Sequence, residues 1–213
     1  MATELRHLKL DMPLETPPAM DALPLRLRAL SLSSMMDQPA SLFKALLPGS
    51  SEALTSLHLF VIKSGAPLHE RVLQAQPALP SNLLHLSIAT HWVPLSDSLV
   101  DFIASCTRLR TLTLTGIVPL QLLEVTSSLS SPLASLDFTV PATFAWHGFA
   151  VEAFFDRILR EQSARHLRFV TATRVLESGS DDRPERTEFV RGTCRCIYEI
   201  TSRASRFIPQ MTA

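Results

Sequence analysis

The feature that most constrains this chain is an apolar phrase, Leu-x-x-Leu-x-Leu, that recurs along most of its length. Seven occurrences can be aligned, and they begin at Leu5, Leu27, Leu54, Leu83, Leu109, Leu133 and, weakly, Ala164. A fixed apolar phrase repeated every 22 to 31 residues is typical of a stacked repeat protein. Each unit of such a protein buries its apolar face against its neighbours, so the working part of the molecule is a surface.

The stretch from 97 to 118 shows how one unit is built. Leu112 and Leu114 alternate with threonines at 111, 113 and 115, which predicts a strand with one buried face. The preceding residues 97–105 follow a helical period, with Leu99, Phe102 and Ile103 on one side. We therefore expect a helix, a short turn, a strand and a loop, with further helices over 41–47, 120–129 and 151–161.

Stacked units of this kind predict an α/β solenoid with a parallel concave sheet of about seven strands and convex helices. The repeats would form one arc over residues 1–172. Beyond it, the extended runs 166–176 and 187–200 flank a polar turn. We expect them to form a capping hairpin within 173–200 that covers the last open edge, followed by a frayed tail over 201–213.

The composition excludes several classes of function. The formal net charge is zero, which gives no overall field to attract nucleic acid or an anionic membrane. Three cysteines are too few, and odd in number, for a secreted disulfide scaffold. The sequence contains no apolar run of membrane-spanning length and no signal-peptide pattern at its start. These observations favour a cytoplasmic protein, or a nuclear one.

The phrase Cys106-Thr-Arg-Leu-Arg-Thr-Leu-Thr-Leu-Thr-Gly116 resembles the leucine-rich repeat family, in particular the irregular repeats of fungal F-box/leucine-rich-repeat proteins. The resemblance covers roughly residues 4–172 and implies a substrate-recognition surface. The usual Asn or Cys three residues after the last leucine is missing, and no F-box precedes the repeats. Because the first phrase begins at Leu5 without a cap, we expect an N-terminal domain or a second protomer to cover that end, or the chain to be a fragment.

The alternation within each phrase predicts which side chains face the concave side. Small hydroxyls dominate these positions, and four histidines fall among them. We expect a protein partner of unknown identity to bind there. The candidate partner-binding residues are His7, Lys9, Ser56, His58, Phe60, His85, Ser87, Thr111, Thr113, Asp137, His166 and Arg168.

Two features of this set have a functional and a plain interpretation. His58 and His85 lie diagonally on adjacent strands and could share a metal ion, but no carboxylate or thiolate stands beside them, so we favour two solvated histidines. Phe60 is the one aromatic side chain expected on the concave side. It is either a binding anchor or packed under the next loop.

Catalytic motifs are missing from the sequence. It contains no Gly-rich phosphate loop, no His-Glu-x-x-His phrase and no Gly-x-Ser-x-Gly elbow. We therefore expect a protein that is not an enzyme and that holds no cofactor or metal. The leading hypothesis is a protein–protein interaction module, and the alternative is a non-catalytic piece of a larger regulatory chain with no binding activity of its own.

Overall fold

The structure of the chain is a computed structural model. The described residues are 5–10, 26–33, 47, 50, 52–61, 72–73, 77–90, 96–116, 124–126, 129–140, 151–161, 166–176, 185–191 and 193–202.

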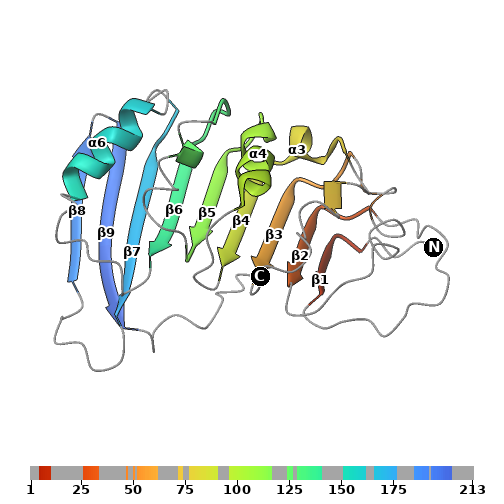
Figure 1. Ribbon diagram of the computed structural model, residues 1–213, viewed down its shortest axis with the longest axis horizontal. Helices are drawn as coiled ribbons and strands as arrows, with labels where there is room; N and C mark the ends of the chain where they lie inside the picture. Colours follow the sequence, from red (N-terminus) through yellow and green to blue (C-terminus); the bar gives the residue numbers. More distant parts are fainter. Residues whose placement is uncertain are drawn as a thin grey trace.

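The described strands form one nine-stranded sheet, and its order is β1-β2-β3-β4-β5-β6-β7-β9-β8 (Figure 1). Every neighbouring pair is parallel except β8 and β9, which are antiparallel. The expected α/β class with a parallel sheet is therefore confirmed. The strands are β1 (His7–Leu10), β2 (Ala29–Ser33), β3 (Ser56–Val61), β4 (His85–Thr90), β5 (Thr111–Thr115), β6 (Ser135–Val140), β7 (Phe169–Leu176), β8 (Glu185–Arg191) and β9 (Cys194–Ser202).

The strands pair in the register that the repeated phrase predicts, from β1 to β6. Leu57 lies beside Leu30 on one side and beside Leu86 on the other, and the same alignment continues to Leu112 and Leu136. Because side chains alternate along a strand, this register sends every second side chain of all six strands to the same face. Apolar side chains therefore gather on one face and polar side chains on the other.

The C-terminal strands differ from the expected capping hairpin. Strand β7 does not pair antiparallel with the run 187–200; it lies parallel to β9, with Val170 beside Cys196. The hairpin is formed by β8 and β9, and β8 is the outermost strand of the sheet. The parallel arrangement allows the buried thiols of Cys194 and Cys196 to extend the apolar face beyond β7. The sheet thus contains eight parallel strands, one more than predicted.

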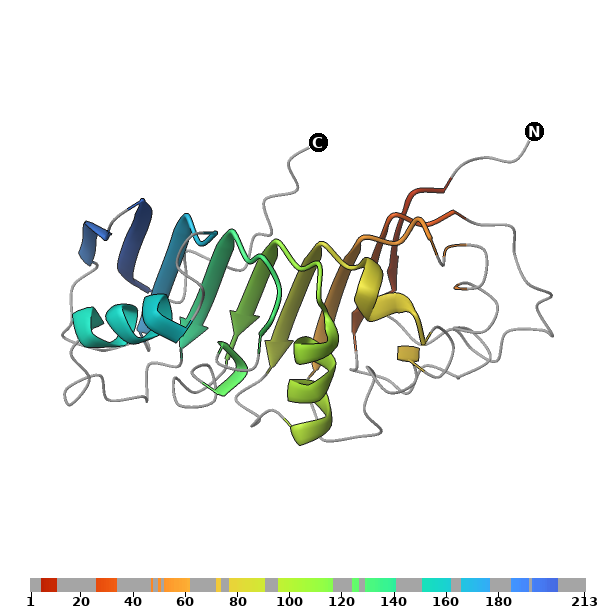
Figure 2. The ribbon, with the colours of Figure 1, turned by 90° about the horizontal axis from the view of Figure 1, so that it is seen from above.

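The described helices all lie on the same side of the sheet, on the convex side of its gentle bow (Figure 2). They are α3 (Leu79–Asn82), α4 (Asp97–Ser105) and α6 (Val151–Glu161). Within the helix expected over 120–129, the described residues 124–126 are helical. The helix expected over 41–47 lies outside the described residues, apart from Leu47. None of the described helices is long and apolar enough to cross a membrane.

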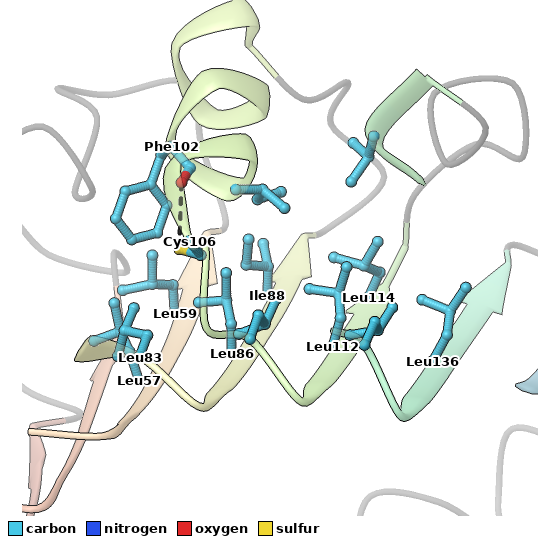
Figure 3. Packing of buried hydrophobic residues seen from close by; sticks show 14 of the residues in the cluster. Leu57, Leu59, Leu83, Leu86, Ile88, Phe102, Cys106, Leu112, Leu114 and Leu136 are labelled. Carbon is cyan, nitrogen blue, oxygen red and sulfur yellow. Dashed lines mark hydrogen bonds between the residues drawn. The ribbon is translucent and has the colours of Figure 1, made fainter. Parts of the chain in front are cut away.

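The core fills the space between the sheet and the helices (Figure 3). Leu99, Phe102 and Ile103 are the buried residues of α4, and they form the helical face that the sequence predicts. Below them the leucine rows form a continuous apolar layer, and each side chain is at most 2% exposed at Leu57, Leu59, Leu86, Ile88, Leu112, Leu114 and Leu136. The thiol of Cys106 donates a hydrogen bond to the carbonyl oxygen of Phe102, with an S···O distance of 3.3 Å.

Candidate interaction surface

The sheet face opposite the helices carries three rows of side chains, which we call the polar face. One row is His7, Ala29, Ser56, His85, Thr111, Ser135, Phe169 and Arg195. The next is Lys9, Ser31, His58, Ser87, Thr113, Asp137, Thr171 and Ile197. The third is Ser33, Phe60, Ala89, Thr115, Thr139, Thr173 and Glu199.

Ten of the twelve residues predicted from the sequence lie in these rows. The structure aligns them from strand to strand, so that side chains far apart in the sequence become neighbours about 4.8 Å apart across the sheet. The first two rows are the more accessible, because Ser33, Ala89 and Thr173 of the third row are buried. The ten residues are His7, Lys9, Ser56, His58, Phe60, His85, Ser87, Thr111, Thr113 and Asp137.

The other two, His166 and Arg168, do not lie in the rows. Both are exposed, but both precede β7, which begins at Phe169. The seventh phrase runs Leu167, Val170, Ala172, three residues later than predicted, and all three side chains are buried. The positions assigned to His166 and Arg168 are therefore wrong, and Phe169 and Thr171 occupy them.

A packing constraint explains this shift. Phe138 of β6 contacts Phe155 of α6, with their ring centroids 6.5 Å apart. The residue of β7 that lies beside Phe138 is Ala172, which has no exposed surface. A small side chain suits that position because two phenyl rings already fill the space next to it. The register predicted from the sequence would instead have placed Phe169 there.

Phe169 is the site residue that the sequence analysis missed. Its side chain is 49% exposed, and it lies between Ser135 and Arg195 on the polar face. The signal that could have revealed it is the alternation from 169 to 173, where Val170 and Ala172 form one phase and Phe169 the other. Phe60, the aromatic expected on this face, lies in the third row and is half-buried.

The centre of the polar face is dominated by small hydrogen-bonding groups. Nδ1 of His85 lies 2.7 Å from the hydroxyl oxygen of Thr111, so the imidazole is held against the neighbouring strand. His58 lies beside Ser31 and Ser87, diagonal to His85, as expected. No group of three or more His, Cys, Asp or Glu in the described residues could hold a metal ion. Hydroxyl and imidazole groups thus supply the hydrogen-bonding capacity at the centre of this surface.

Charged side chains appear where the hairpin joins the sheet. Nη2 of Arg195 donates a hydrogen bond of 2.9 Å to Oε2 of Glu188, and Nε of Arg195 donates to the other carboxylate oxygen. These hydrogen bonds lower the pKa of the Glu188 carboxyl below its ordinary value. Arg186 forms an ion pair with Glu199 at 3.1 Å. Opposite charges on β8 and β9 thus neutralise each other across the hairpin.

The cysteines belong to the core. Burial raises the pKa of the Cys106 thiol to about 12. A hydrogen bond with Cys196, together with burial, raises the pKa of the Cys194 thiol. A thiol that stays protonated is a poor nucleophile and a poor metal ligand. All three thiols are free and buried, so they form part of the apolar core.

The first strand marks the end where the apolar face is least covered. Leu8 and Leu10 of β1 are only partly buried, whereas Leu30 and Leu32 beside them are 1% exposed. Leu5 is 41% exposed. An N-terminal domain or second protomer over this end stays a prediction.

Comparison of the chain with protein-family models, curated proteins and solved structures found no significant match.

Proposed function

We propose that this chain is a leucine-rich-repeat protein-interaction module that binds a protein partner on its polar face. The recurring phrase and the in-register parallel strands support the repeat architecture. Neighbouring phrases bury their leucines in one shared layer, as stacked repeats do. The polar face is the concave side of the bowed sheet, and the described helices lie on the other side (Figure 2).

One observation carries the proposal: small hydroxyl side chains are aligned along the face and end at an exposed aromatic. Ser87 and Thr113 lie side by side at its centre, and Phe169 lies two strands beyond Thr113, beside Arg195. Aromatic and Arg side chains are the residues that most often dominate the energy of protein interfaces. Short hydroxyls around them leave room for a partner and form adaptable hydrogen bonds.

The partner class follows from the resemblance of the repeats to F-box/leucine-rich-repeat proteins. In that setting the polar face would recognise a substrate protein without catalysing a reaction. The free, buried cysteines agree with a reducing compartment, the cytoplasm or the nucleus. The protein would then act through the partner that it holds and through any further domain that it is joined to.

The test is affinity capture with a variant whose polar face is obstructed. Ser87→Lys with Thr113→Lys places two long charged side chains at the centre of the face. A matched control, Ser105→Lys with Thr107→Lys, makes the same chemical change at the exposed end of α4. Quantitative mass spectrometry should detect proteins that the wild type and the control capture equally and that the face variant loses.

Binding must then be reproduced between the purified chain and the purified partner. The face variant should weaken this binding at least about tenfold, which corresponds to about 1.4 kcal/mol. Circular dichroism should report the same fold and melting cooperativity for all three proteins. Capture of the same proteins by the face variant would remove the proposed function.

A further inference from the structure

A second aligned set of side chains lies at the end of the sheet where the parallel strands begin. The carbonyl oxygen of the residue just before each strand accepts two hydrogen bonds from the neighbouring segment. The donors are the backbone N–H groups of the first residue of the next strand and of the residue before it. Arg28 and Ala29 donate to Arg6 in this way, at 2.7 and 3.0 Å. The pattern repeats at every parallel step, and the accepting residues are Arg6, Arg28, Thr55, Leu84, Arg110, Ala134 and Arg168, the last of which accepts from the N–H of Arg195.

Four of these seven residues are arginine. Two more arginines, Arg26 and Arg108, lie two residues before Arg28 and Arg110. All six side chains are exposed. Because the accepting residues are in register, the arginines share one rim of the sheet. We call this set the arginine rim, and it consists of Arg6, Arg26, Arg28, Arg108, Arg110 and Arg168.

Two arginines of the C-terminal hairpin are paired with carboxylates, and most of the rim arginines have no such partner among the described residues. Within the described part of the chain, the side chains of Arg26, Arg28, Arg108, Arg110 and Arg168 form no ion pair and no side-chain hydrogen bond. Arg186 and Arg195, in contrast, are paired with Glu199 and Glu188. The three described residues that directly precede each of β2 to β7 include no Asp or Glu, and the described acids Glu52, Asp101 and Glu161 lie four or more residues before β3, β5 and β7. The rim is therefore a local excess of positive charge.

This charge is local in a chain that is neutral as a whole. The formal net charge is zero and the isoelectric point is about 7.1, whereas domains that bind nucleic acid through phosphates are usually strongly basic. Guanidinium groups form paired hydrogen bonds with carboxylates and with phosphates alike, so the neutral overall charge is what separates the two classes of partner. The observations thus favour carboxylates over a phosphate backbone.

The spacing of the rim suits an extended polypeptide. Arg28 and Arg110 are separated by three strand steps, and Arg110 and Arg168 by two. At about 4.8 Å per step these separations are roughly 14 and 10 Å. An extended chain advances about 3.3 Å per residue, so acidic residues three or four positions apart match the rim.

We infer that the arginine rim is a binding site for an acidic, extended segment of a protein partner. The rim is a different surface from the polar face, and this inference does not depend on the proposed function. The arginines would pair with Asp or Glu side chains of a segment that runs across the strand starts. Long-range attraction would also speed its association at low ionic strength.

Fluorescence anisotropy with a defined probe tests this inference. The probe is a labelled peptide of about twelve residues with Glu at every third position, long enough to cross the roughly 29 Å between β1 and β7 when extended. A peptide of equal length with Gln in place of Glu is the neutral comparison. The full chain should bind the Glu peptide and not the Gln peptide, and added salt should weaken the binding.

Two matched variants locate the site. Arg28→Gln with Arg110→Gln should weaken binding of the Glu peptide about tenfold, because two carboxylate pairs are lost. Arg157→Gln with Arg160→Gln removes the same charge from exposed positions of α6, on the other side of the sheet, and should change the affinity less than about twofold. Arg28→Lys with Arg110→Lys keeps the charge but loses the paired geometry, and should give an intermediate loss.

Three results would overturn the inference: no binding of the Glu peptide at low salt, equal weakening by the rim variant and the α6 variant, or tighter binding of a single-stranded RNA of equal length. The last would assign the rim to a phosphate backbone instead. Thermal melts followed by circular dichroism check that each variant is folded. The lysine pair retains all charges, so it tests the site even if the glutamine pair does not fold.

Discussion

The backbone carbonyl of Thr90 occupies the space that a side chain at Gly116 would need. Gly116 follows β5 directly, with a φ angle of +81°, in the left-handed region that side chains disfavour. Its N–H donates a hydrogen bond of 2.8 Å to the carbonyl oxygen of Thr139, and the hydroxyl of Thr90 donates to the carbonyl oxygen of Thr115. These contacts hold the ends of three neighbouring strands together at a glycine.

Gly116→Ala should therefore destabilise the chain by at least about 2 kcal/mol, since it combines backbone strain with a clash against main-chain atoms. Urea unfolding followed by circular dichroism measures the change. Thr115→Ala is the control, because Thr115 uses only its carbonyl oxygen in this contact, and it should cost less than about 1 kcal/mol. Equal stability of Gly116→Ala and the wild type would contradict this account of the loop.

The alternation within β5 gives a second prediction. Leu114 has no exposed surface, whereas Thr113 faces the polar side. Leu114→Ala should cost about 2–5 kcal/mol, because it removes buried methyl groups and leaves a cavity between the sheet and the helices. Thr113→Ala should cost less than about 1 kcal/mol. The same unfolding measurement compares the two, and similar losses would argue against a sheet with one buried face.

The sequence predicted the fold well wherever one pattern was repeated without change. From β1 to β6 the leucine phrase set both the strand positions and their register, because a slip of one residue would have sent Leu86 or Leu112 to the polar side. The candidate residues on these strands followed from that register. Their role in binding stays a prediction.

The failures occurred where the pattern alone was ambiguous. Around β7, Leu167 fits both possible phrases, and the packing of Phe138 against Phe155 decides between them. Contacts between residues far apart in sequence cannot be read from a local pattern. The predicted pairing of the C-terminal strands was wrong for a related reason. Two extended runs indicate that strands exist, but they do not show that β9 pairs with β7 while β8, which lies between them in the sequence, takes the outer edge of the sheet. The arginine rim was not predicted, because its residues lie just before the alternating stretches that indicate the strands.

Burial of Cys106 predicts a specific loss of stability at alkaline pH. The pKa of its thiol is about 12 in the folded chain, above the ordinary value of 9.0. The unfolded chain therefore loses this proton first, and stability falls as the pH rises from about 9 to about 12. One such group contributes a slope of at most about 1.4 kcal/mol per pH unit.

Comparison of the wild type with Cys106→Ala isolates this contribution. The free energy of unfolding should decline less steeply above about pH 9 in the variant, although its stability at neutral pH is lower because the sulfur no longer fills its site. Parallel declines in the two proteins would show that the Cys106 thiol does not retain its proton in the folded state.

Phe169 provides the sharpest test of the C-terminal register. In the structure it is 49% exposed on the polar face, and the adjacent Val170 is fully buried. Phe169→Ala should therefore cost less than about 1 kcal/mol, whereas Val170→Ala should cost about 1–3 kcal/mol. The register expected from the sequence reverses this order, because an inward Phe169 would lose about 3–5 kcal/mol on truncation.

Ala172→Leu adds an independent measurement at the same strand. Ala172 lies beside Phe138, so a larger side chain there would overpack the contact with Phe155 and cost about 1–3 kcal/mol. Thr171→Leu, one residue earlier, points to the polar face and should be nearly neutral in urea unfolding. If instead the larger loss comes from Thr171→Leu and Phe169→Ala, then β7 is shifted and Phe169 belongs to the core rather than to the candidate binding face.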